Sequence, residues 1–210
     1  MSKFTAKKRL NNTCNPSFIK PEGCEWVKSF NKETTLNEET EYLIVGTLTP
    51  PDGRGECVNG VFPGYFYCSD SNDMYLFLDE SFPDRETKLV TLKDKFRKSG
   101  WDNSVKEEMK EELKARHVAF LDVVDEAYAK IGSSRDDDID NYLLDKNSFK
   151  DLPSNLKVVA NSNNVKTALE HILGIEGIEM IPQSLRGNWS YKNKEGLIRA
   201  WKEFFEEVDD

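Results

Sequence analysis

The sequence predicts a three-layer α/β sandwich, in which helices cover both faces of a central four-stranded parallel sheet. Two observations lead to this fold class. Short apolar runs alternate with longer segments of helical periodicity, which is the order of elements in βαβ units. The first two apolar runs are also hydrophobic at nearly every residue, as expected for strands buried on both faces. A length of 210 residues suits one such domain.

Each expected strand ends in polar or strand-breaking residues. The first is followed by Gly-Thr-Leu-Thr-Pro-Pro, and prolines cannot extend a ladder. The second carries Asp122 near its end, where a buried carboxylate either caps the next helix or has a task; both readings stay open. The expected strands are residues 42–45, 117–124, 156–160 and 178–181.

The expected helices follow from apolar residues spaced three and four apart. The segment 84–99 also carries several lysines, which could face phosphate but more simply form a solvated face. The expected helices are residues 74–82, 84–99, 105–116, 163–172 and 197–205, with Asn163 or Asn164 capping the fourth.

The first 41 residues are expected to form an N-terminal extension packed on a domain that spans residues 42–210. Trp26 is expected in the core. The four cysteines form no CxxC pair, which favours free thiols over disulfides, a metal site or an iron–sulfur cluster. We therefore expect no metal and no cofactor.

Charge and hydropathy limit the partners. The net charge is −9, so a nucleic-acid partner would need a local basic face. No apolar run approaches the ~20 residues that span a bilayer, and the N-terminus lacks the apolar stretch of a signal peptide. We expect a cytoplasmic protein without a membrane partner.

Polar and aromatic groups gather after the first strand. Gly46 and Thr47 end it, an aromatic cluster occupies residues 65–67, and Ser69 and Asn72 precede the next helix. Ligands of open α/β sheets bind at the carboxyl ends of the strands. We therefore expect the functional site at this edge of the sheet.

Three sequence blocks occur in order between residues 42 and 205. They are LIVGTLTP at 43–50 with GYFY at 64–67 and Asn72, then RHVAFLDVV at 116–124, then IPQSLRGN at 181–188. With these blocks the chain resembles the uracil-DNA glycosylase superfamily, closest to its hypoxanthine (deoxyinosine) branch. It departs from the family pattern at Ser69, where the family has histidine, and at Arg186, where it has proline.

The resemblance implies a function. It implies a monomeric DNA glycosylase that hydrolyses the N-glycosidic bond of uracil or hypoxanthine in DNA repair, with DNA containing a damaged or deaminated base as partner. It makes Asn72 catalytic and places Asp122 where it reads the base. The implied base-binding residues are Gly46, Thr47, Leu48, Tyr65, Phe66, Tyr67 and Ser69, and those that contact DNA are Ser184, Arg186 and Asn188.

Other functions stay open. A catalytically inactive relative that binds nucleic acid or nucleotides would suit the acidic charge and the departures at Ser69 and Arg186. Asn72 together with Asp122 favours the enzyme. An enzyme of free nucleosides or nucleotides is a third hypothesis, and it would also suit an acidic surface.

Overall fold

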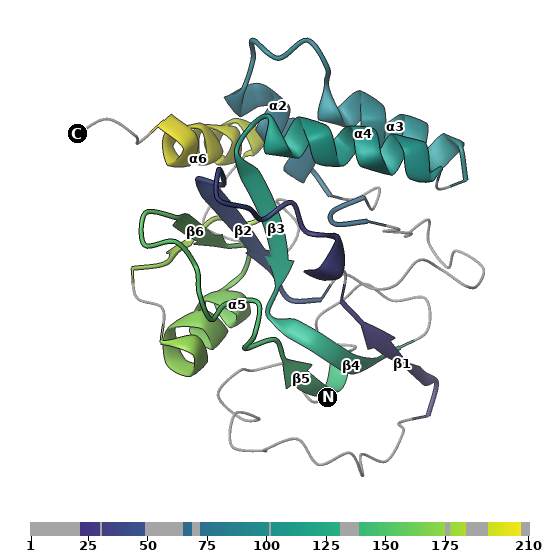
Figure 1. Cartoon of the computed structure of the whole chain (residues 1–210), viewed down its shortest axis with the longest axis vertical. Helices are drawn as coiled ribbons and strands as arrows, with labels where there is room; N and C mark the ends of the chain where they lie inside the picture. The colour runs from purple at the N-terminus through teal and green to yellow at the C-terminus, as the bar shows by residue number, and fades with distance from the viewer. Residues whose placement is uncertain are drawn as a thin grey trace.

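A parallel sheet of four strands forms the centre of the molecule (Figure 1). The computed structural model describes residues 22–29, 31–48, 65–68, 72–100, 102–130, 139–174, 177–183 and 193–206. The strand order is β3-β2-β6-β7, and every neighbouring pair is parallel. The strands are β2 (Tyr42–Gly46), β3 (Val118–Asp122), β6 (Lys157–Ala160) and β7 (Glu179–Met180). The predicted fold class is confirmed, together with its four strands.

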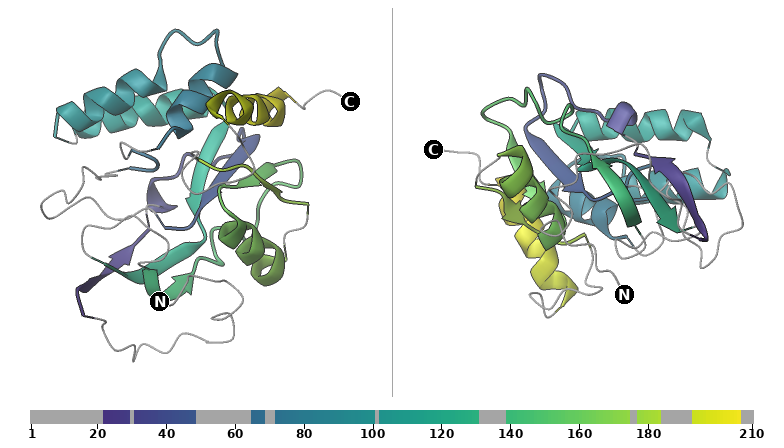
Figure 2. Two further views of the ribbon diagram at one scale, coloured as in Figure 1. Left: turned by 180° about the vertical axis from the view of Figure 1, so that it is seen from behind. Right: turned by 90° about the horizontal axis from the view of Figure 1, so that it is seen from below.

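Helices cover both faces of this sheet. One side carries α2 (Met74–Ser81), α3 (Leu89–Lys98), α4 (Asn103–Lys114) and α6 (Lys194–Glu206). Figure 1 shows these helices gathered at one side of the molecule, and Figure 2 shows the same arrangement from behind and from below. The opposite face carries α5 (Asn163–Ala168), which continues as a π-helical turn over Leu169–Leu173.

Strand β2 contributes side chains to two hydrophobic cores, one on each face of the sheet. Its side chains point alternately to opposite faces of the sheet. Tyr42 and Ile44 belong to the cluster formed with α2, α3, α4 and α6, whereas Leu43 and Val45 belong to the cluster formed with α5. The strand is therefore buried on both faces, and its unbroken apolar run reflects this.

A second sheet was not predicted. It is antiparallel, has the order β1-β4-β5, and consists of β1 (Cys24–Lys28), β4 (Val124–Lys130) and β5 (Ile139–Leu144). The chain leaves β3 at Asp122 and enters β4 after a single residue, so the expected strand 117–124 spans the junction. Register irregularities in the pairing of β4 with β5 disturb the alternation by which such strands are recognised.

Trp26 was expected in the core and is instead 37% exposed on β1. Its ring packs edge-on against Tyr128 of β4 at 4.8 Å between centroids, and its indole N–H donates to Glu126. A half-exposed sheet can carry a tryptophan whose polar end is satisfied at the surface.

Helix boundaries differ from the prediction where a side chain caps the helix. The helix expected from residue 84 begins at Leu89, because the carboxylate of Asp79 accepts hydrogen bonds from the backbone N–H groups of Leu89 and Val90. Helix α5 is capped by Ser162, one residue before the expected caps. Among the described helices, none is both long and apolar enough to cross a membrane.

Candidate active site at the carboxyl edge of the parallel sheet

Three polar groups converge over Gly46, the last residue of β2. A methyl group at Gly46 would lie 2.8 Å from Asp122 Oδ1, 3.1 Å from the Tyr67 hydroxyl and 3.4 Å from Asn161 Nδ2. The first of these separations is too short for a real Cβ contact. Glycine therefore allows side chains from β3, from the segment before α2 and from the end of β6 to meet at one place.

Three carboxamides lie beside this place, and we call Asn72, Asn161 and Gln183 the carboxamide cluster. The Gln183 Oε1 atom accepts hydrogen bonds from Asn72 Nδ2 at 3.0 Å and from Asn161 Nδ2 at 3.1 Å. Asn161 Nδ2 also lies 3.4 Å from the Tyr67 hydroxyl. The cluster consequently joins β6, the segment after β7 and the start of α2 through uncharged groups.

Backbone contacts and one buried tryptophan fix Gln183. The Gln183 carbonyl accepts from the Asp73 N–H at 3.3 Å. The neighbouring Pro182 carbonyl accepts from the indole N–H of Trp201 at 3.1 Å, and Trp201 of α6 is fully buried. Packing of α6 in the core therefore determines where the glutamine side chain can reach.

Asn72 is held on two sides. Its Oδ1 accepts from the Met74 N–H at 2.9 Å, so it satisfies the first N–H of α2 from the residue before the N-cap Asp73. Its backbone carbonyl accepts from Lys93 Nζ at 2.7 Å. Lys93 is buried, and this burial lowers the pKa of its ammonium group. The asparagine is thus anchored by α2 and α3 together.

Asp122 is held through its backbone by Asn31. Asn31 Oδ1 accepts from the Asp122 N–H at 2.7 Å, and Asn31 Nδ2 donates to the Asp122 carbonyl at 2.8 Å and to Asp145 Oδ2 at 2.7 Å. Burial raises the pKa of Asp145, but hydrogen bonds from Ser148 and Asn31 outweigh it and hold that pKa below its ordinary value. Asn31 therefore ties the end of β3 to an ionised carboxylate after β5.

The predicted aromatic cluster divides into two parts. Tyr67 reaches the site with its hydroxyl and has a left-handed φ of 56°, an uncommon conformation for a bulky residue. Tyr65 and Phe66 are not brought to this edge, because their rings are fully buried in the core. The turn through Tyr67 thus brings its hydroxyl to the site, while its ring packs against Phe120 at 4.8 Å between centroids in the same core cluster as the other two rings.

The other predicted base-binding residues have plain structural contacts or are not described. The Thr47 carbonyl accepts from the Val124 N–H at 3.0 Å, and Leu48 is buried in the core cluster on the α5 side. Ser69, Ser184, Arg186 and Asn188 lie outside the described residues. The structure brings together Gly46, Tyr67, Asn72 and Asp122 from the predicted set, and it adds Asn31, Asn161 and Gln183, which the sequence prediction missed.

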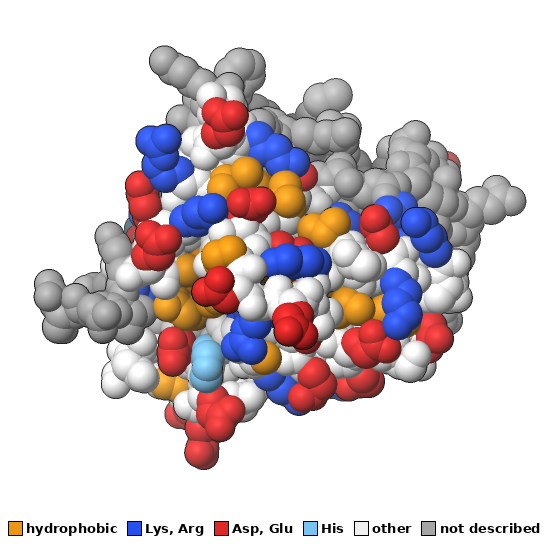
Figure 3. All heavy atoms as spheres, turned by 90° about the horizontal axis from the view of Figure 1, so that it is seen from above, with side chains coloured by type: hydrophobic (Ala, Val, Ile, Leu, Met, Phe, Trp, Pro, Cys, Tyr) orange, Lys and Arg blue, Asp and Glu red, His pale blue; other side chains and the backbone are white. Residues whose placement is uncertain are grey.

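The lysine-rich helical face is balanced by acids. Figure 3 shows basic and acidic side chains interspersed over the side of the molecule that the four helices cover. Within residues 84–99, Lys95 pairs with Glu108 at 3.0 Å, Lys88 donates to the Pro83 carbonyl at 2.9 Å, and Lys93 is buried. These contacts favour the interpretation of a solvated face over that of a phosphate-binding stripe.

Comparison with known proteins identifies the fold. No protein-family model matches the chain, and no curated protein matches it. Among solved structures, the solution NMR structure of a candidate uracil DNA glycosylase from Methanosarcina acetivorans is similar, with a TM-score of 0.53 and 17% identity over 86% of this chain and 99% of that one. The chain thus has an α/β sandwich fold like that of this candidate glycosylase.

Proposed function

We propose that the protein is a DNA glycosylase-like hydrolase that releases a deaminated base, uracil or hypoxanthine, from DNA. One observation carries this proposal: Asp122, Tyr67 and Asn161 meet at Gly46 at the carboxyl edge of the parallel sheet, and Gln183 connects Asn161 to Asn72. This is the edge at which α/β sheets bind their ligands. The fold shared with a candidate uracil DNA glycosylase supports the same class of reaction.

The chemistry suits a site in which neutral hydrogen-bonding amides lie beside one carboxylate. Breaking an N-glycosidic bond builds positive charge on the sugar and negative charge on the departing base. In the proposed mechanism Asn72 is the catalytic residue, and the second lone pair of its Oδ1 orients the attacking water. Its Nδ2 donates to Gln183 and its Oδ1 accepts from Met74, so the amide is already oriented before substrate arrives.

In the same proposal the base leaves the DNA stack and is received at the carboxyl edge of the sheet, beside Asp122 and Tyr67. Tyr67 supplies aromatic surface, and Tyr65 and Phe66 support it from the core. The backbone at residues 46–48 and the side chain of Ser69 are proposed as further groups that bind the base. The carboxylate of Asp122 accepts a hydrogen bond from a ring N–H of the base.

The DNA backbone is proposed to meet the residues that follow Gln183 in the sequence. Ser184 and Asn188 offer uncharged donors, and the Arg186 guanidinium pairs with a phosphate. The protein would act on DNA as a monomer. A single arginine in this segment supplies a local positive charge despite the net charge of −9.

The direct test is cleavage of labelled DNA. Single- and double-stranded oligonucleotides that contain uracil, hypoxanthine or xanthine would be incubated with excess protein and then treated with alkali. We expect strand breaks at one or more of these bases and none in undamaged DNA. If every deaminated base stays intact, the glycosylase proposal is wrong.

A catalytically inactive relative is the second candidate function. The observation that favours it is the state of Asn72, whose amide nitrogen and oxygen both already have protein partners. Such a protein would bind deaminated DNA in a mobility-shift assay and leave it uncut.

Replacing Asp122 with asparagine should change the base preference. A carboxylate only accepts hydrogen bonds, whereas an amide also donates, so Asp122→Asn can pair with the unprotonated ring nitrogen of an unmodified base. We expect the relative single-turnover rates on hypoxanthine, uracil, adenine and cytosine to shift by roughly tenfold or more for at least one pair.

Asp145→Asn is the matched control for this change. Asp145 is a buried carboxylate that contacts Asn31 but does not belong to the group over Gly46. It should lower the melting temperature and leave the order of base preference unchanged. If Asp122→Asn also lowers the melting temperature without changing the order of base preference, Asp122 is structural and does not read the base.

A further inference from the structure

The orientation of the carboxamide cluster can be worked out from a single backbone group. A backbone N–H can only donate, so the Met74 N–H requires the oxygen of Asn72 and turns Asn72 Nδ2 toward Gln183. Gln183 must then present Oε1, and Asn161 must present Nδ2 to that oxygen. Each amide is thus assigned by its neighbour, and no flipped arrangement satisfies all three residues.

This orientation leaves one buried oxygen without a partner. Asn161 is 9% exposed, and its Oδ1 is buried with no hydrogen-bond partner among the described residues. An unsatisfied buried carbonyl oxygen is costly, and such exceptions in native structures need an explanation. Asn161 Nδ2 and Asp122 Oδ1 both lie within 3.4 Å of the same point above Gly46. The unpaired oxygen therefore belongs to a residue that borders the volume proposed for the base.

We propose that Asn161 is a specificity-determining residue, whose Oδ1 accepts a ring N–H of the base together with the Asp122 carboxylate. The inference rests on the proposed function and deepens it. One N–H can be shared between two acceptor oxygens in a three-centre hydrogen bond. The ligand class is a base whose ring nitrogen carries hydrogen beside a carbonyl, as N3 of uracil and N1 of hypoxanthine do.

This arrangement reads the atom that deamination changes. In cytosine and adenine the corresponding ring nitrogen is an unprotonated acceptor, which would face two acceptor oxygens. A site built to bond an N–H rejects an analogue without it, because its own buried groups are then left unpaired. Of the two acceptors, Asn161 supplies the neutral amide oxygen and Asp122 the charged carboxylate. Gln183 is the positioning residue, because it accepts a hydrogen bond from the Asn161 amide nitrogen.

The test measures binding of free bases by the full-length protein. Isothermal titration calorimetry would compare hypoxanthine with 1-methylhypoxanthine and uracil with 3-methyluracil, because methylation replaces the ring N–H with N–CH3 and keeps the ring carbonyl groups. We expect the wild-type protein to prefer each unmethylated base by about 10- to 100-fold. In Asn161→Ala this preference should fall by about tenfold, because no oxygen at this position is left to satisfy. Asn163→Ala, an exposed asparagine two residues away, should keep the full preference.

The outcomes separate the inference from the proposed function. If Asn161→Ala keeps the wild-type preference, or if the wild-type protein binds none of the bases or does not distinguish them, the role of Asn161 is wrong whatever the cleavage assay shows. If the preference depends on Asn161 while deaminated DNA stays uncut, the role of Asn161 is supported and the proposal of glycosylase activity is wrong. Should Asn161→Ala fail to fold, Asn161→Ser removes the same amide at smaller loss of volume and is judged by the same preference.

Discussion

Asn72→Ala should lower the single-turnover rate of base release by about 10²–10³, with little change in DNA affinity. The alanine removes the amide that is proposed to orient the attacking water. It also removes the acceptor for the Met74 N–H, so a loss of ~1 kcal/mol in the free energy of unfolding is expected as well. Rates measured with enzyme in excess over a deaminated oligonucleotide would isolate the chemical step.

Asp102→Ala is the control that separates catalysis from capping. Asp102 is exposed and accepts from the Ser104 N–H at 2.8 Å at the start of α4, so its loss removes a comparable cap. Both variants should show similar decreases in melting temperature, but only Asn72→Ala should lose activity. Equal rates in the two variants would mean that Asn72 is merely a helix cap.

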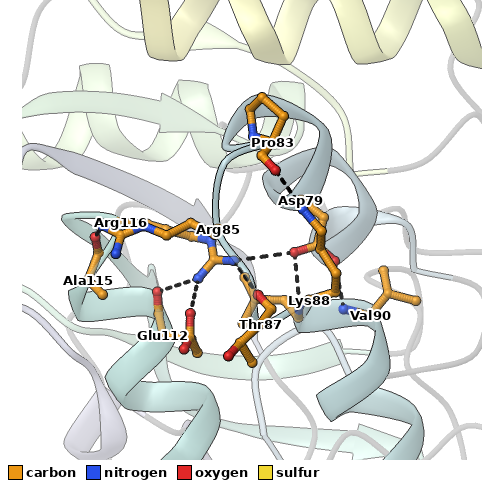
Figure 4. Close-up of polar contacts among 10 residues, drawn as sticks. Asp79, Pro83, Arg85, Thr87, Lys88, Val90, Glu112, Ala115 and Arg116 are labelled. Atoms are coloured by element: carbon orange, nitrogen blue, oxygen red, sulfur yellow. Dashed lines mark hydrogen bonds and ion pairs between the residues drawn. The ribbon is translucent and has the colours of Figure 1, made fainter.

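Arg116→Met should cost about 3–5 kcal/mol of stability, the range for breaking a buried ion pair by removing one partner. Arg116 follows α4 and is 1% exposed. Its guanidinium donates to Glu112 Oε2 at 2.6 Å and to the Thr87 carbonyl at 2.8 Å, and it lies 3.5 Å from Asp79 Oδ1 (Figure 4). Methionine fills much of the same volume, so the loss reports the polar contacts rather than a cavity. Urea unfolding of the wild-type protein and of Arg116→Met would measure the difference in the free energy of unfolding.

Arg85→Met provides the matched comparison. Arg85 lies in the same region, is exposed, and donates to the Ala115 carbonyl (Figure 4). Surface changes of this kind usually alter stability by less than ~0.5 kcal/mol. If the two variants lose similar stability, burial of the Arg116 guanidinium is not what makes it important. Arg116 lies at the amino end of β3 and Asp122 at its carboxyl end, so base preference should be unchanged in either folded variant.

The parallel sheet could be predicted because its signals are local. The run Leu43–Val45 lies within the central strand, and its composition shows burial on both faces without knowledge of any partner. Position along the chain also placed Gly46, Asp122 and Asn72 at one edge, because parallel strands end together. The second sheet escaped prediction because β1 pairs with β4 about a hundred residues later, and β4 is only partly buried.

The carboxamides that complete the site could not be found in the same way. Asn31, Asn161 and Gln183 are single amides in polar segments, and nothing adjacent to them in sequence indicates a partner. Their roles come from contacts with residues 22 to 114 positions away. The aromatic cluster shows the complementary problem, because the φ of Tyr67 decides which ring faces the site. A positive φ can be anticipated from the sequence where the residue is glycine, but the residue type of a tyrosine does not indicate it.

The Asn31 contacts also affect the order in which the protein can fold during synthesis. Asn31 is made early, but the backbone of Asp122 and the carboxylate of Asp145 follow 91 and 114 residues later. At a typical translation rate of ~5–20 residues per second, this delay is on the order of 5–20 s. During that time the strand that pairs with β1 and the residues that bind the Asn31 side chain have not yet been made. The carboxyl end of β3 therefore gains its contacts with Asn31 only after the ribosome has passed Asp145, and Gln183 is fixed in place only once α6 has been made.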